Sequence, residues 1–147
     1  MSILELKNVT KTINNGPKEQ KTLLDAVNLT IRPGDFITVL GGNGAGKSTL
    51  FNSISGTLDV TQGQILLRGT DITVLSEEKR AASIARVFQD PKMGTAPRMT
   101  VAENLFLAQK RGEKRGLRLR RIKQQKPFYF DLCQTIGNGL ENHLDTP

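Results

Sequence analysis

Residues 41–48 read Gly-Gly-Asn-Gly-Ala-Gly-Lys-Ser, which fits the pattern G-x-x-x-x-G-K-[ST] of a phosphate-binding loop. A polyphosphate brings several negative charges into a small volume, and backbone N–H groups surround it only where the chain curls tightly. Glycines permit that curl because they carry no Cβ. The stretch therefore predicts a nucleotide phosphate site formed by Gly41, Gly42, Asn43, Gly44, Ala45, Gly46, Lys47 and Ser48.

The side chains at the end of this loop have separate predicted roles. Lys47 supplies a mobile cation for the β- and γ-phosphates, and the Ser48 hydroxyl is a hard oxygen ligand for Mg²⁺. Thr49 can add a hydroxyl contact to phosphate. A glycine turn with a surface lysine is the alternative, and the strand-like and helix-like segments that flank the loop disfavour it.

The segments on both sides of the loop predict the architecture around it. Residues 36–40 are nearly all apolar or β-branched, which is typical of a strand buried on both faces. Residues 47–55 predict a short helix that Gly56 ends. The apolar face of this helix consists of Leu50, Phe51 and Ile54. A strand, a phosphate loop and a helix in this order predict an α/β fold with a P-loop NTPase core.

The N-terminal segment predicts an antiparallel β-subdomain. Residues 3–9 and 27–32 alternate between apolar and polar side chains, as expected for strands with one wet face. Turn residues around 14–17 separate them, so the two segments predict a hairpin. Residues 64–68 predict a further strand, because glycines bound an apolar run.

The second half of the chain predicts mostly helices. Ser76 is placed to cap a helix, residues 85–89 predict a strand, and residues 90–99 predict a loop. Thr100 and Glu103 form a capping-box pattern that begins a helix through about residue 108. Pro127 suits the first turn of another helix, whose packing face we expect to include Phe128, Leu132 and Ile136.

Several motifs in order resemble those of the ATP-binding subunits of ABC transporters. Residues 40–50, LGGNGAGKSTL, are similar to the Walker A region of that family, and residues 23–35 are similar to its lead-in. Residues 63–65 and 69–72 resemble its next strand and turn. Val87-Phe88-Gln89-Asp90 matches its Q-loop, and residues 99–105, MTVAENL, match the helix start that follows.

The resemblance implies a site and a set of partners. It implies that the cofactors are ATP and Mg²⁺, that Gln89 and Ser48 lie on the metal side, and that Gln89 links nucleotide state to the helical subdomain. The implied partners are a transmembrane permease subunit, a second ATPase subunit in a head-to-tail dimer, and a solute-binding protein. The implied location is peripheral, on the cytoplasmic face of the cytoplasmic membrane.

One position departs from the family pattern. The family usually places an aromatic residue after the first strand to stack on adenine, and the aligned residue here is Ile13. An aliphatic side chain covers a base by dispersion but lacks the π-stacking geometry. The alternative is that Ile13 packs at the end of the hairpin without contacting a nucleotide.

The sequence lacks the family's remaining catalytic motifs. It contains no LSGGQ-type signature and no apolar strand ending in Asp-Glu, and the only histidine, His143, precedes the position of the signature. We therefore expect an N-terminal portion with an incomplete sheet that binds nucleotide weakly and does not hydrolyse it alone. Residues 1–89 would form the β-subdomain and P-loop core, and residues 90–147 the Q-loop exit and helical subdomain.

Composition limits the other function classes. The 147 residues carry a net charge of +7, and residues 110–126 alone hold nine basic residues and one acidic residue. This segment predicts a solvated helical face, with attraction to anionic lipid as an alternative. Nucleic-acid binding is disfavoured because the segment contains no aromatic residue. The single cysteine, Cys133, excludes an internal disulfide and favours a cytosolic protein.

Three functions remain at this point. The first is an ATP-binding subunit that powers solute transport, with import favoured because no membrane segment is fused to it. The second is an ABC-type ATPase that acts on RNA or ribosomes. The third is a generic P-loop kinase, which the Q-loop context disfavours.

Overall fold

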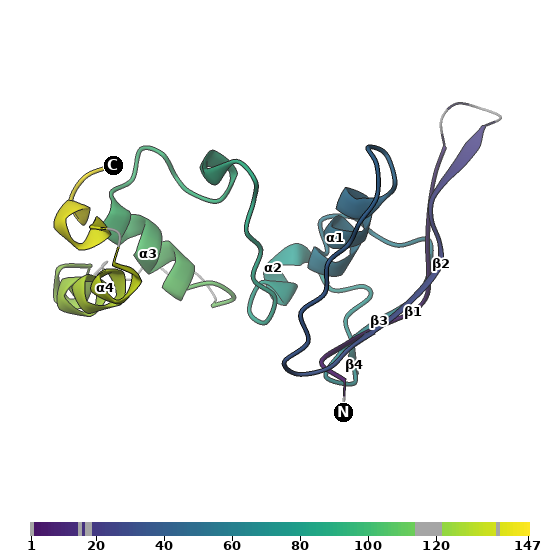
Figure 1. The fold of residues 1–147 in the computed structure, drawn as a ribbon, viewed down its shortest axis with the longest axis horizontal. Coiled ribbons are helices and arrows are strands. Elements are labelled where there is room, and N and C mark those ends of the chain that lie inside the picture. Colours follow the sequence, from purple (N-terminus) through teal and green to yellow (C-terminus); the bar gives the residue numbers. More distant parts are fainter. Residues whose placement is uncertain (1, 15, 17–18, 114–121, 138) are drawn as a thin grey trace. The chain divides into compact units, whose positions relative to one another are not determined.

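The computed structural model describes residues 2–14, 16, 19–113, 122–137 and 139–147. The chain divides into two compact units, Met1–Ile84 and Ala85–Pro147. Figure 1 shows the β-strands and the first helices in the first unit, and the remaining helices in the second.

The first unit contains a four-stranded antiparallel sheet with the strand order β2-β1-β3-β4. The predicted hairpin is confirmed, because Leu4 pairs with Ile31 and Leu6 pairs with Leu29. The predicted strand at 64–68 is also present, two residues earlier at its start. The strands are β1 Leu4–Asn14, β2 Gln20–Ile31, β3 Gln62–Leu67 and β4 Thr70–Asp71.

Alternation along the strands directs one face of this sheet into a core. Leu6, Val9 and Ile65 are almost completely buried, whereas Glu5 and Lys7 lie on the other face and form an ion pair. The helix α1, Lys47–Ser55, was predicted correctly and packs Leu50 and Ile54 against this core. A short helix, α2 Glu77–Arg80, follows the sheet, with Ser76 at its N-cap position.

The strands predicted at 36–40 and 85–89 are wrong. Both segments are irregular, and Phe36 and Val87 are 94% and 95% exposed. A strand forms only where a neighbouring strand accepts and donates its backbone hydrogen bonds. No strand among the described residues pairs with either segment, so their apolar pattern alone does not make them strands.

Among its described residues, the second unit contains two packed α-helices, α3 Val101–Gln109 and α4 Ile122–Ile136. The predicted capping box is confirmed: the Glu103 amide donates to the Thr100 hydroxyl, and a Glu103 carboxylate oxygen accepts from the Thr100 amide. Short 3₁₀ turns occupy Pro91–Met93 and Leu140–His143. The core of this unit consists of Ala102, Tyr129, Cys133 and Leu144.

The prediction for α4 is wrong in its start and in its packing face. The helix begins at Ile122, so Pro127 lies in its second turn, where it removes one backbone hydrogen bond. Tyr129 and Cys133 face the core because α3 and the Leu140–His143 turn pack on that side. The residues predicted as the packing face are exposed: Phe128, Leu132 and Ile136.

Candidate functional site

The loop at 41–46 enters α1 through a glycine that no other residue can replace without strain. Gly46 is the N-cap of α1 with φ 85°, and its carbonyl accepts the first helical bond from the Leu50 amide at 2.8 Å. A Cβ on Gly46 would lie 2.7 Å from the carbonyl oxygen of Leu23 on β2. Both the backbone conformation and the close approach of β2 therefore require glycine here.

The Lys47 side chain turns back over the loop that precedes it. Its Nζ donates to the carbonyl oxygens of Gly41 at 2.7 Å and Gly42 at 2.8 Å. These bonds tie the first turn of α1 to the start of the loop. The ammonium group consequently lies within the curl, where a phosphate group would meet a positive charge.

The first turn of α1 presents unneutralised positive potential. It contains no acidic residue, and Gly46 has no side chain that could bond to the first amides of the helix. The N-terminal end of a helix carries a partial positive charge and amides without helical partners, and both favour an anion. The geometry is therefore suited to binding phosphate oxygens.

The residues after Lys47 fit the predicted contacts to metal and phosphate. The side chains of Ser48 and Thr49 belong to the first turn of α1, and Ser48 is exposed. No group of three His, Cys, Asp or Glu side chains gathers among the described residues. An exposed hydroxyl oxygen suits a Mg²⁺ ion, which retains waters and takes further ligands from nucleotide phosphates.

Two predicted site residues lie outside this loop. Ile13 is near the end of β1, opposite Lys21 on β2, and is 37% exposed, so its contact with a base stays a prediction. Gln89 is exposed and belongs to the second unit. The structure therefore brings together the loop, Lys47, Ser48 and Thr49, while the place of Gln89 at the metal stays a prediction.

The sequence patterns missed one residue that contacts α1. Arg80, the last residue of α2, is 2% exposed and bonds to backbone carbonyls at the C-terminal end of α1. Its burial has no local signal, because an arginine that ends a polar helix is usually solvated. Only the packing of α2 beside α1 reveals this contact.

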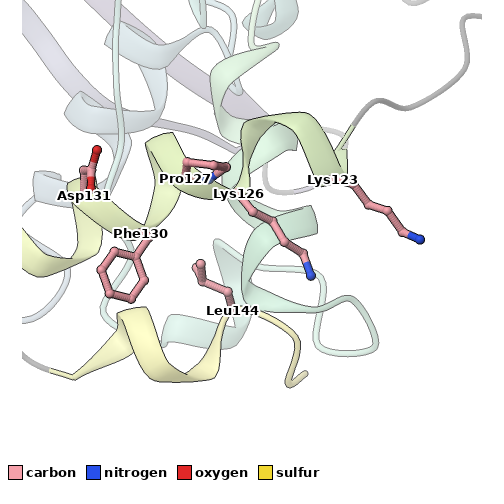
Figure 2. A pocket seen from close by; sticks show the side chains of 6 residues that line it. All are labelled: Lys123, Lys126, Pro127, Phe130, Asp131 and Leu144. Carbon is pink, nitrogen blue, oxygen red and sulfur yellow. The ribbon is translucent and has the colours of Figure 1, made fainter.

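A separate open pocket of about 540 Å³ lies beside α4 in the second unit (Figure 2). None of its lining residues belongs to the phosphate loop, and its Lys126 forms an ion pair with Asp145. Residues 114–121 of the basic segment 110–126 lie outside the described residues. The pocket is lined by Lys123, Lys126, Pro127, Phe130, Asp131 and Leu144.

No helix in the described part of the chain has the length and the apolar character needed to cross a bilayer.

Comparison with known proteins identifies the family. The family model described as "ABC transporter" matches residues 24–142, which include the loop, α1 and both helices of the second unit. The chain belongs to the ABC transporter family. The match is continuous and includes both the loop at 41–48 and Gln89.

The chain is similar to ATP-binding proteins of known transporters. It is 41% identical over 144 residues to the tyrosine transport ATP-binding protein of Clostridioides difficile, covering 97% of this chain and 57% of that protein. It is 38% identical over 142 residues to the methionine import ATP-binding protein MetN of Corynebacterium diphtheriae, covering 94% of this chain and 41% of that protein. The chain thus spans about half the length of these curated relatives.

Solved structures of ABC cassettes share the fold. A dimeric cassette bound to ADP and Pi in a post-hydrolysis state superposes with a TM-score of 0.73 at 28% identity, over 97% of this chain and 60% of that one. A nucleotide-free ATP-binding cassette from an ABC transporter gives 0.71 at 27% identity, over 99% and 57%. The comparisons therefore show the ABC ATPase fold class that the sequence predicted, while the binding of phosphate by residues 41–48 stays a prediction.

Proposed function

We propose that this chain is the nucleotide-binding portion of an ATPase subunit that powers solute transport across the cytoplasmic membrane. The observation that carries this proposal is the Lys47 ammonium, which is tied within the glycine loop at the N-terminal end of α1. The match to the ABC transporter family over residues 24–142 supports a transporter subunit over an unrelated P-loop enzyme.

In this proposal each part of the loop binds a different portion of MgATP. The amides of the loop and of the first turn of α1 surround the phosphates, and Lys47 neutralises the β- and γ-phosphate charges. Ser48 from α1 and Gln89 would hold the Mg²⁺ ion, which draws charge away from the phosphates when bound. Ile13 would cover the adenine by dispersion.

The partners in this proposal follow from the transport role. They are a transmembrane permease subunit, a second ATPase subunit and a solute-binding protein, which would place the chain peripherally on the cytoplasmic face of the membrane. The relatives named above serve tyrosine transport and methionine import, which supports a transporter, with import favoured. No observation on the chain favours action on RNA or ribosomes.

We also propose that these 147 residues bind MgATP without turning it over. They contain the phosphate loop, whereas the Walker B carboxylates and the signature motif do not occur in them. Phosphoryl transfer needs the metal, the positioned phosphates and an oriented water together. Binding and turnover should therefore separate in this chain.

The test is a titration of the purified chain with MgATP, with Lys47→Ala as the site variant. Hydrogen bonds to a charged group contribute about 1.5–3 kcal/mol, so we expect Lys47→Ala to weaken binding about ten- to a hundredfold. Lys79→Ala is the matched control, because Lys79 is an exposed lysine of the same unit, outside the loop. It should bind as wild type.

Three results would contradict the proposal. Absence of binding at millimolar MgATP, or equal affinity in Lys47→Ala and wild type, would remove the assigned phosphate site. Steady phosphate release by wild type that Lys47→Ala abolishes would show that the chain does turn ATP over, against the second part of the proposal.

A further inference from the structure

Arg80 is a buried cation whose hydrogen bonds within the described part of the chain all go to backbone carbonyl groups. Its Nε donates to Leu75 at 2.9 Å and its Nη2 donates to Thr73 at 2.8 Å. Its Nη1 donates to Ser53 at 2.7 Å and to Ile54 at 3.0 Å. One guanidinium group therefore joins the C-terminal turn of α1 to the turn that follows β4.

The carbonyl groups of Ser53 and Ile54 lie in the last turn of α1, where a helix leaves its carbonyls without partners inside the helix. The last carbonyls of a helix carry the negative end of its dipole, and a cation there satisfies and stabilises them. Gly56, just past the helix, has φ 85°, and a Cβ on it would lie 2.9 Å from Nε of Arg80. The glycine therefore both ends α1 and leaves room for the guanidinium.

The guanidinium group of Arg80 stays positively charged although it is buried. Burial lowers the pKa of Arg80, while the charges of Asp59 and Asp71 raise it. An arginine starts from so high a pKa that it keeps its proton in this setting. Arg80 is therefore a cation at the negative end of α1.

The same contacts connect α1 to the sheet. The Thr73 carbonyl that accepts from Arg80 belongs to a residue whose hydroxyl accepts from the Ile65 amide on β3 at 2.9 Å. Ile65 is fully buried in the core of the first unit. A continuous set of hydrogen bonds thus runs from β3 through Thr73 and Arg80 to the end of α1.

Apolar packing holds α1 only in part. Its two buried residues are the small polar residues Ser53 and Ser55, and Phe51 is 49% exposed. Leu50 and Ile54 are only partly buried against the core. The hydrogen bonds from Arg80 to the C-terminal end of α1 therefore add to this packing in fixing the direction of the helix.

We propose that Arg80 is a positioning residue for the phosphate site, because it fixes the C-terminal end of the helix whose first turn binds phosphate. A nine-residue α-helix is a rod of about 13 Å, so a tilt at one end displaces the amides and Lys47 at the other. This inference rests on the proposed nucleotide binding.

The test compares MgATP affinity with stability in Arg80→Met and Arg80→Lys. Methionine keeps much of the apolar stem but leaves four carbonyls without their donor, whereas lysine keeps the charge and reaches fewer carbonyls. At a temperature where each variant is folded, we expect Arg80→Met to bind MgATP about tenfold more weakly, with partial recovery in Arg80→Lys. Lys79→Met, an exposed neighbour on α2, is the matched control and should bind as wild type.

A purely structural role predicts a different pattern. It lowers the melting temperature but leaves the affinity of the folded molecules unchanged, so wild-type affinity in folded Arg80→Met overturns the inference. Where Arg80→Met does not fold, Arg80→Lys decides: wild-type affinity overturns the inference, and an affinity several times weaker supports it.

The two proposals fail in distinguishable ways. Absence of MgATP binding by wild type refutes the proposed function, and the positioning role falls with it. If Lys47→Ala weakens binding but both Arg80 variants bind as wild type, the proposed function stands and the inference about Arg80 is wrong.

Discussion

Replacing Gly46 by alanine tests the geometry of the phosphate loop most directly. Gly46 has φ 85°, a conformation that residues with a Cβ rarely adopt, and the added Cβ would lie 2.7 Å from the Leu23 carbonyl oxygen. Contacts below 3.0 Å are essentially never seen for a Cβ, so the loop or β2 must shift. The substitution therefore combines backbone strain with a steric conflict.

The size of the effect follows from these two terms. The left-handed conformation costs a residue with a Cβ about 1–2 kcal/mol. The contact with β2 adds to this cost, so we expect a loss of at least ~2 kcal/mol in the free energy of unfolding. For a unit of this size, 1 kcal/mol corresponds to about 4–8 °C, so the melting temperature should fall by roughly 8 °C or more.

The assay is thermal unfolding followed by circular dichroism, with two glycine controls in the same loop. Gly44 has φ 80° and no atom within 4 Å of an added Cβ, so Gly44→Ala should show the strain alone. Gly42 has an ordinary φ and the same open surroundings, so Gly42→Ala should stay within ~0.5 kcal/mol of wild type. A melting temperature for Gly46→Ala equal to that of Gly42→Ala would refute the reasoning.

Two further predictions concern stability elsewhere in the chain. Thr100→Ala removes the capping box of α3 and should lower the free energy of unfolding by about 1 kcal/mol, seen as a lower denaturant midpoint. Thr100→Ser keeps the hydroxyl and should stay near wild type, and equal midpoints for both variants would contradict the prediction. The pKa of Asp71 lies below its ordinary value of 3.8, because the Thr73 hydroxyl and amide donate to its carboxylate. As the pH falls, the unfolded chain therefore takes up this proton before the folded chain does, so the stabilisation from Asp71 that is present above about pH 4 should be lost at lower pH. In Asp71→Asn, which has no such proton, the free energy of unfolding should fall less steeply with acid. An unchanged acid slope in that variant would argue against the prediction.

Local patterns predicted the elements whose formation depends on neighbouring residues in the chain. The hairpin followed from alternation, α1 from its glycine boundaries, and α3 from Thr100 and Glu103. These signals succeed because a turn, a cap or a helical face involves residues a few positions apart. The motif order likewise indicated the family that the comparisons show.

The wrong predictions concern packing partners that a local pattern does not contain. The apolar residues 36–40 form no strand because no described strand pairs with them. The sequence of α4 offers two apolar faces, and it does not say which of them is buried. Contact with α3 and the Leu140–His143 turn selects Tyr129 and Cys133 over Phe128 and Ile136.

Residues 41–48 were enough to predict a phosphate-binding loop, because that chemistry needs only glycine backbone freedom, one lysine and one hydroxyl at fixed spacing. Tertiary structure alone decided how the loop and its helix are held. Gly46 must be glycine because β2 passes 2.7 Å from its would-be Cβ, and Arg80 is buried because α2 packs at the end of α1. Gly46 lies 23 residues from Leu23, and Arg80 lies 27 residues from Ser53, so folding and not local pattern brings each pair together.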